Sequence, residues 1–200
     1  MSFWDKVSPV YDILQVVNRR SFRAMAEGVR QVVPEGAKVL ECAAGTGILT
    51  AAAAEKAESV VCTDLSLPML EKARKKCADM GFDNVSFEER DIYNMPDKDE
   101  TYDAVVAGNV LHLLDEPERA VKELARVTKK GGKLILPTFL NADKDFSTSL
   151  LKIYRVLGFR SKEYTFDEFR AMLERCNAGR MKITRINGFM PAAFVVIRKG

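Results

Sequence analysis

The chain has 200 residues, of which 47% are hydrophobic and 30% charged, and these proportions are typical of a single globular domain. Its formal net charge of +3 is too small to indicate binding to nucleic acid or to an anionic membrane. No apolar run approaches the roughly 20 residues of a membrane span, and no signal peptide is recognised at the N-terminus. We therefore expect a cytoplasmic protein without stable membrane insertion.

The first helical pattern begins at Ser8-Pro9, a pair typical of a helix N-cap and first turn. Apolar residues follow it at helical spacing as far as Val17. A second helical run extends from Phe22 to Val33, and Pro34 ends it. The sequence thus predicts two helices before the first strand.

Apolar runs typical of buried strands then alternate with helical segments. The predicted strands are Lys38–Glu41, Ser59–Asp64, Val85–Phe87, Tyr102–Gly108 and Lys133–Pro137. Helices are predicted over residues 48–58, from the cap residue Ser66 onward, and from Glu116-Pro117 to Gly131-Gly132. This alternation indicates a parallel sheet with helices on both faces.

The C-terminal part contains two further helical segments and a pair of strands. The helices are predicted over residues 143–156 and Thr165–Cys176. Met181–Ile186 and Phe194–Arg198 are predicted as strands, and the short loop Gly188–Pro191 between them implies an antiparallel hairpin.

The four cysteines form no Cys-x-x-Cys pair and no spacing typical of metal ligands. They fall on predicted strands and helices, where cysteine usually behaves as a small hydrophobic residue. The sequence therefore predicts no metal site, and free thiols agree with a cytoplasmic location.

The stretch from Val39 to Asp64 carries the strongest functional signal. An apolar strand leads into a turn of small residues that ends at Gly47, and a second strand ends at Asp64. A turn of Ala and Gly lets a ligand approach the backbone closely. An acid about 20 residues beyond such a turn can accept hydrogen bonds from ribose hydroxyls. This layout indicates a site for a nucleoside cofactor.

Short polar residues also follow the other strands at their carboxyl ends. The set is Glu41, Asp64, Asp91, Asn109 and Thr138. Ligands of open parallel sheets bind at this edge. Such an array suits a ligand with an adenine, a ribose and a polar tail laid across several strands.

Several motifs now stand in order: Glu41…Gly45-Thr-Gly47, Asp64-Leu-Ser, Arg90-Asp91-Ile92, Tyr102-Asp103…Asn109-Val-Leu-His112 and Gly131-Gly-Lys133-Leu. Over roughly residues 37 to 138 the sequence resembles the class I S-adenosylmethionine-dependent methyltransferases. It is most similar to the methyltransferase type 11 group, which contains the ubiquinone/menaquinone-biosynthesis enzymes. The implied α/β fold is a Rossmann-like, seven-stranded, mostly parallel sheet with an antiparallel C-terminal hairpin and helices on both faces.

The resemblance also implies a domain organisation. Residues 1–200 would form a single methyltransferase domain. Within it, residues 1–34 would be an N-terminal helical lid, 35–138 the cofactor-binding core, 139–164 a substrate-cap segment, and 165–200 the final helix and hairpin.

The resemblance assigns the nucleoside half of S-adenosylmethionine to residues after the second and third strands. Asp64 would accept from the ribose hydroxyls, and Leu65 would line the adenine. Asp91 would accept from the adenine amino group, and Ile92 would pack on the ring. Tyr11 is similar to an N-terminal tyrosine that covers the cofactor in many relatives.

The methionine half is assigned to the first turn and the fourth strand. Glu41 would hold the amino end, and the backbone at Gly45 and Gly47 would pack along the methionine moiety. The backbone near Asn109 would meet the methionine ammonium. Ala43 stands where the family usually has Gly, and we expect cofactor binding to survive this departure.

Each assignment has a structural alternative. These are a helix cap for Asp64, a loop acid for Asp91, a turn residue for Asn109 and core packing for Tyr11. His112 is the only histidine and hence the candidate general base, but its apolar neighbours favour packing near the cofactor. The sequence therefore predicts catalysis mainly by positioning and in-line attack.

The expected acceptor is a small, partly apolar molecule, because residues 1–33 and 139–164 are rich in aromatic side chains; the alternative is that these side chains only seal the core. The Asn/Asp-Pro-Pro-aromatic motif of enzymes that methylate nucleic acids is absent, so no nucleic-acid partner is expected. The oligomeric state stays open. Two alternative functions stay open as well: a non-catalytic domain that binds S-adenosylmethionine, and an NAD-dependent oxidoreductase, which would need a Gly-x-Gly-x-x-Gly turn.

Overall fold

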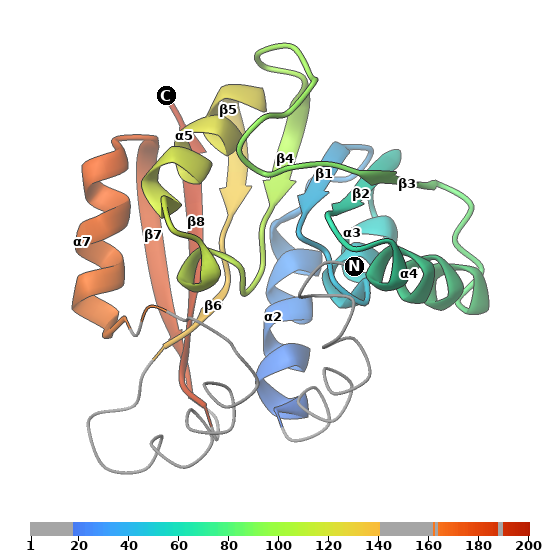
Figure 1. Ribbon diagram of the computed structural model, residues 1–200, viewed down its shortest axis with the longest axis horizontal. Coiled ribbons are helices and arrows are strands. Elements are labelled where there is room, and N and C mark those ends of the chain that lie inside the picture. Colours follow the sequence, from blue (N-terminus) through green and yellow to red (C-terminus); the bar gives the residue numbers. More distant parts are fainter. Residues whose placement is uncertain (1–17, 141–161, 163, 188–189) are drawn as a thin grey trace.

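The fold is built on one twisted sheet with helices on both of its faces (Figure 1). The computed structural model describes residues 18–140, 162, 164–187 and 190–200. The helix predicted from Ser8-Pro9, the helix predicted over 143–156, and Tyr11 lie outside the described residues.

The strands follow the predicted order along the chain. They are β1 (Lys38–Cys42), β2 (Ser59–Asp64), β3 (Val85–Glu89), β4 (Tyr102–Val106), β5 (Thr128–Ile135), β6 (Thr138–Phe139), β7 (Gly179–Ile186) and β8 (Ala192–Lys199). The sheet order is β3-β2-β1-β4-β5-β8, and both β7 and β6 pair with β8. The first five strands run parallel, and β8 is antiparallel to β5, β6 and β7. The mostly parallel sheet with a C-terminal hairpin is confirmed, and the two-residue β6 is an addition after Pro137.

The described helices are α2 (Arg19–Val32), α3 (Ile48–Ala54), α4 (Leu67–Asp79), the short 3-10 helix η1 (Leu111–Leu113), α5 (Pro117–Val127) and α7 (Phe166–Cys176). Alternate strand residues face opposite layers. Val39 and Val106 pack with Met25 of α2, whereas Leu40 packs with Leu124 of α5. Helices therefore cover both faces, as predicted.

Two predicted helix boundaries were wrong. The helix from Ile48 ends at Ala54, before the predicted Glu58. Gly131-Gly132 does not end α5, which stops at Val127. The Thr128 hydroxyl donates to the carbonyl of Leu124 (2.7 Å), and the chain turns there into β5. The two glycines lie within β5, beside an irregularity in its pairing with β4, where a side chain on Gly132 would meet backbone oxygens at 2.8 and 2.9 Å.

The C-terminal helix begins as its sequence predicted. Thr165 is the N-cap of α7, its hydroxyl accepts from the Glu168 N–H (3.2 Å), and Glu168 in return accepts from the Thr165 N–H (2.8 Å). All four cysteines are free and buried. Within the described ranges, every helix is too short or too polar to cross a bilayer.

Candidate functional site

Two adjoining cavities open at the carboxyl edge of the sheet, where the loops after β1, β2, β3 and β4 meet, and the larger of the two is called the main cavity. Its lining residues are Ala43, Gly45, Asp64, Leu65, Met69, Arg90, Ile92, Gly108, Asn109, Val110, Leu113 and Leu114. Aliphatic side chains predominate, and Asp64 and Arg90 are the ionisable residues among them. The smaller cavity next to it shares Ala43, Gly108 and Asn109, and adds Phe22, Glu41, Ala44, Thr46, Ile48 and Leu49.

Asp64 at the end of β2 connects two loops. One carboxylate oxygen accepts from the Gly45 N–H (2.8 Å), and the other accepts from the Ser66 N–H (2.9 Å). The second bond fits the cap role that the sequence left open, and the first fixes the turn after β1. Asp64 also lies in the lining of the main cavity, so its carboxylate can both shape the turn and meet a ligand.

Glu41 at the end of β1 is buried in the wall of the smaller cavity. The Thr50 hydroxyl of α3 donates to one of its carboxylate oxygens. Burial raises the pKa of Glu41; the Thr50 hydrogen bond lowers it, the nearby charge of Asp64 raises it, and the net result is a pKa of about 8. A cation bound in this cavity would therefore stabilise the ionised form of Glu41.

The turn between β1 and α3 has an unusual backbone. Ala43, Gly45 and Gly47 all have positive φ (52°, 56° and 76°). At Gly47 a Cβ atom would lie 2.8 Å from the Cβ atom of Ala73 on α4. Gly47 lines neither cavity, so the packing of the turn on α4 accounts for this glycine. Ala43 and Gly45 lie in the cavity wall, as the sequence predicts.

Asn109 after β4 lines both cavities and also connects three segments. Its side-chain oxygen accepts from the Phe139 N–H (3.0 Å), and its Nδ2 lies 3.5 Å from the sulfur of Met25. Its own N–H donates to the carbonyl of Pro137 (2.8 Å). The neighbouring Gly108 has no room for a Cβ atom, which would overlap Leu49. Asn109 therefore has the turn role as well as a place in the wall.

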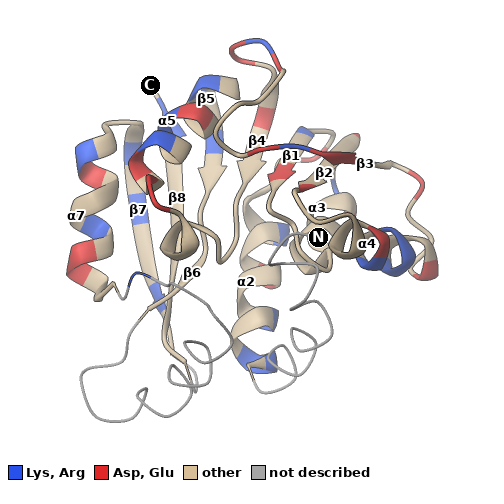
Figure 2. Ribbon diagram, in the orientation of Figure 1, with Lys and Arg blue, Asp and Glu red and all other residues tan. Residues whose placement is uncertain are grey.

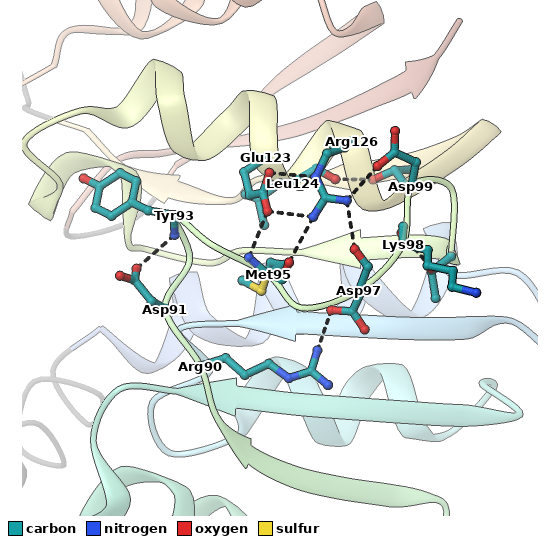
Figure 3. Close-up of polar contacts among 12 residues, drawn as sticks. Arg90, Asp91, Tyr93, Met95, Asp97, Lys98, Asp99, Glu123, Leu124 and Arg126 are labelled. Atoms are coloured by element: carbon teal, nitrogen blue, oxygen red, sulfur yellow. Dashed lines mark hydrogen bonds and ion pairs between the residues drawn. The ribbon is translucent and has the colours of Figure 1, made fainter.

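Of the residues after β3, one lies in the lining of the main cavity and another lies on the protein surface. Ile92 is buried and lines the main cavity. Asp91 is exposed, lies outside the lining of both cavities, and accepts from the Tyr93 N–H (2.9 Å; Figure 3). Leu65, which follows Asp64, lines the cavity with half of its surface exposed.

His112 lies in η1 and lines neither cavity. Its Nδ1 is buried and has no hydrogen-bond partner in the described part of the chain. Burial lowers the pKa of the imidazole to about 4, so it is neutral near pH 7 and a weak base. These features agree with the packing interpretation.

Several wall residues were not singled out from the sequence. They include Met69, Arg90, Val110, Leu113 and Leu114. Arg90 belongs to the Arg90-Asp91-Ile92 motif, in which the resemblance assigns roles to Asp91 and Ile92 only. Over residues 18–140, 162, 164–187 and 190–200, no group of three or more His, Cys, Asp or Glu residues is placed to hold a metal ion.

Comparison with known proteins identifies the family. Residues 40–136 match the family described as "Methyltransferase domain". A demethylmenaquinone methyltransferase of Clavibacter sepedonicus is 36% identical over 143 residues, which are 69% of this chain and 57% of that protein. A phosphatidylethanolamine N-methyltransferase of Cereibacter sphaeroides is 32% identical over 151 residues, 70% of this chain and 74% of that protein.

The solved structures agree on the fold. Magnesium protoporphyrin IX methyltransferase of Synechocystis PCC 6803, crystallised with bound S-adenosylhomocysteine, is 20% identical with a TM-score of 0.70, and the match covers 93% of this chain and 87% of that one. The chain spans little more than half the length of the Clavibacter relative. It belongs to the class I S-adenosylmethionine-dependent methyltransferases, in the group of the demethylmenaquinone methyltransferases, and its cofactor is S-adenosylmethionine.

Proposed function

We propose that this chain transfers a methyl group from S-adenosylmethionine to a small, partly apolar acceptor, mainly by holding the two reactants in line. The observation that carries the proposal is the cavity at the carboxyl edge. There Asp64, the aliphatic Leu65 and Ile92, and Gly45 all line the same cavity.

The residues that line this cavity suit the nucleoside half of the cofactor. The carboxylate of Asp64 would accept from ribose hydroxyls, while Leu65 and Ile92 offer apolar surface for a flat base. Asp91 would contribute at the rim, next to Ile92, in its assigned role toward the adenine amino group. The resemblance further assigns Tyr11 as a cover.

The methionine half would occupy the smaller cavity and the turn beside it. Glu41 would hold the cationic amino end, and Gly45 and Gly108 keep the wall free of side chains. Asn109 would contribute at the end of β4. When bound, S-adenosylmethionine supplies an activated methyl group on a sulfonium.

Neither ionisable side chain among the described residues that line the main cavity is suited to proton transfer. Asp64 accepts from backbone amides and Arg90 is paired with Asp97 (2.6 Å) and Glu88 (2.8 Å). His112 lies outside the wall. The residues therefore bind, orient and exclude water, which suffices for an acceptor that is already nucleophilic.

Aromatic side chains support a partly apolar acceptor. Phe22 lines the smaller cavity and stacks edge-to-face with Phe139 (ring centroids 5.3 Å apart). The two relatives are named for the acceptors demethylmenaquinone and phosphatidylethanolamine, which are both lipids. We propose that residues 1–34 act as a lid and 139–164 as a cap over the acceptor, around the core 35–138 and ahead of the final helix and hairpin, 165–200.

A turnover assay with labelled cofactor tests the proposal. The acceptors to be compared are a demethylated naphthoquinone with a short prenyl chain, phosphatidylethanolamine in vesicles, and glycine as a polar control. We expect labelled product from an apolar acceptor, lost in Asp64→Ala and kept in Asp83→Ala, which changes an exposed acid outside both cavities. Binding of S-adenosylhomocysteine without turnover of any acceptor would instead favour the non-catalytic cofactor-binding domain.

A further inference from the structure

The loop between β3 and β4 contributes residues to the lining of the main cavity. Two side chains of α5 that lie outside this cavity bind the loop (Figure 3). The Glu123 carboxylate accepts from the Met95 N–H (2.8 Å). The Arg126 guanidinium donates to the carbonyls of Met95 (3.1 Å) and Asp97 (2.8 Å) and to the carboxylate of Asp99 (2.7 Å). Two side chains of one helix thus bind four groups of one loop.

Glu123 and Arg126 also fix each other. Arg126 donates to both carboxylate oxygens of Glu123, at 2.7 and 2.8 Å. The pair is partly shielded from water, with side-chain exposures of 17% for Glu123 and 31% for Arg126. The Arg126 hydrogen bond lowers the pKa of Glu123, so both groups are charged near pH 7. Only the planar guanidinium group of an arginine has enough N–H groups to donate to all these acceptors at once.

The other side of the loop is anchored at the sheet. Asp97 accepts from Arg90 (2.6 Å) and from the hydroxyl of Tyr102 (2.7 Å), and the side chains of Arg90 and Asp97 are only 11% and 12% exposed. Nearer the cavity, the hydroxyl of Tyr93 accepts from the Glu116 N–H at the start of α5 (3.1 Å). The segment that holds Ile92 is therefore fixed at both ends.

Both the β3–β4 loop and the segment that precedes α5 contribute residues to the main cavity. Arg90 and Ile92 line the main cavity, and so do Val110, Leu113 and Leu114, which lie shortly before α5. Glu123 and Arg126 line neither cavity. We propose that Glu123 and Arg126 are positioning residues, which hold the β3–β4 loop so that Ile92 and Asp91 meet the adenine of the cofactor. The proposal depends on the cofactor site and not on the proposed methyl transfer.

Binding of S-adenosylhomocysteine, measured by calorimetry well below each variant's melting temperature, tests the proposal. Arg126→Lys keeps the charge and loses the planar guanidinium group, so we expect binding weaker by about tenfold. Glu123→Ala should weaken it similarly, and Glu123→Gln, which keeps an acceptor for the Met95 N–H, should recover most of the affinity. Arg170→Lys is the control, because Arg170 forms an exposed ion pair with Glu174 (2.9 Å) within α7, a helix that carries both acidic and basic residues (Figure 2).

A merely stabilising role would lower the melting temperature alone, so base selectivity is the second readout. We expect the preference for S-adenosylhomocysteine over its inosine analogue to shrink in Arg126→Lys and to persist in Arg170→Lys. If Arg126→Lys and Glu123→Ala bind within about twofold of the parent chain with unchanged selectivity, the positioning role is wrong while the cofactor site stands. Failure of the parent chain itself to bind would overturn the cofactor site and the positioning role together.

Discussion

Ala43 offers a sharp test of the geometry of the cofactor turn. It is the first residue after β1, lines both cavities, and has a φ of +52°. An L-residue with a side chain is strained in this region, whereas glycine adopts it freely. Its neighbour Ala44 is half-buried like Ala43 and does not have a positive φ. The pair Ala43→Gly and Ala44→Gly therefore differs mainly in backbone conformation.

The expected magnitudes follow from three contributions. Replacing Ala by Gly costs about 0.4–1 kcal/mol through the entropy of the unfolded chain, and about 0.4 kcal/mol for half of a buried methyl group. At Ala43 alone, the change also relieves about 1–2 kcal/mol of left-handed strain. Ala43→Gly should therefore be close to neutral or slightly stabilising, while Ala44→Gly should cost about 1 kcal/mol.

The difference between the two variants isolates the strain, because the other contributions are common to both. At about 2–4 °C per kcal/mol for a domain of this size, it amounts to roughly 2–8 °C in melting temperature. Calorimetry on both variants and the parent chain measures it, with denaturant titration as a check. Equal destabilisation by the two substitutions would refute the strain at Ala43. Affinity for S-adenosylhomocysteine should hold or rise in Ala43→Gly, because the loss of a methyl group opens the wall.

Three further predictions concern single residues. Asp64→Ala should weaken S-adenosylhomocysteine binding by about tenfold or more, with Asp83→Ala as control; unchanged affinity in calorimetry would count against the ribose role. Glu41 has a pKa of about 8 in the folded chain, above its ordinary value of 4.5, so the unfolding free energy should fall as pH rises between these values. Glu41→Gln should flatten this slope in denaturant titrations, and equal slopes would contradict the raised pKa. His112→Gln should keep turnover within about threefold and leave its pH profile from about 5.5 to 8 unchanged, since the imidazole is already neutral; a loss of about a hundredfold would mark it as a base.

Much of the fold could be predicted because its signals are local. The strand Ser59–Asp64 has the predicted bounds, and Ser66 stands at the N-cap of α4. In α4 the buried side chains, Met69, Leu70, Ala73 and Cys77, follow one another at helical spacing. An apolar run, a cap residue and a helical period each depend on residues within a few positions of one another, so a single sequence shows them.

The predictions that went wrong involve competition between local and distant contacts. Gly131-Gly132 is a common helix end, yet α5 stops earlier because Thr128 closes its last turn and enters the sheet. The site shows the same limit. Asn109 was recognised as a strand-end residue, but its contacts with Met25 and Phe139 span 84 and 30 residues, and no local pattern reveals them.

For the same reason, several residues of the cofactor cavity could be predicted from the sequence, whereas the residues of α5 that support it could not. The turn after β1 and the acid at the end of β2 form a compact motif that the sequence displays. Arg126 lies on α5, which the sequence predicts only as a helix that packs on the sheet. Its partners Met95 and Asp97 are 31 and 29 residues away along the chain. If α5 fixes the wall that meets the adenine, then changes on its outer surface should alter cofactor affinity without touching the cavity. The residues that set this affinity would then extend well beyond those that any motif of the family marks.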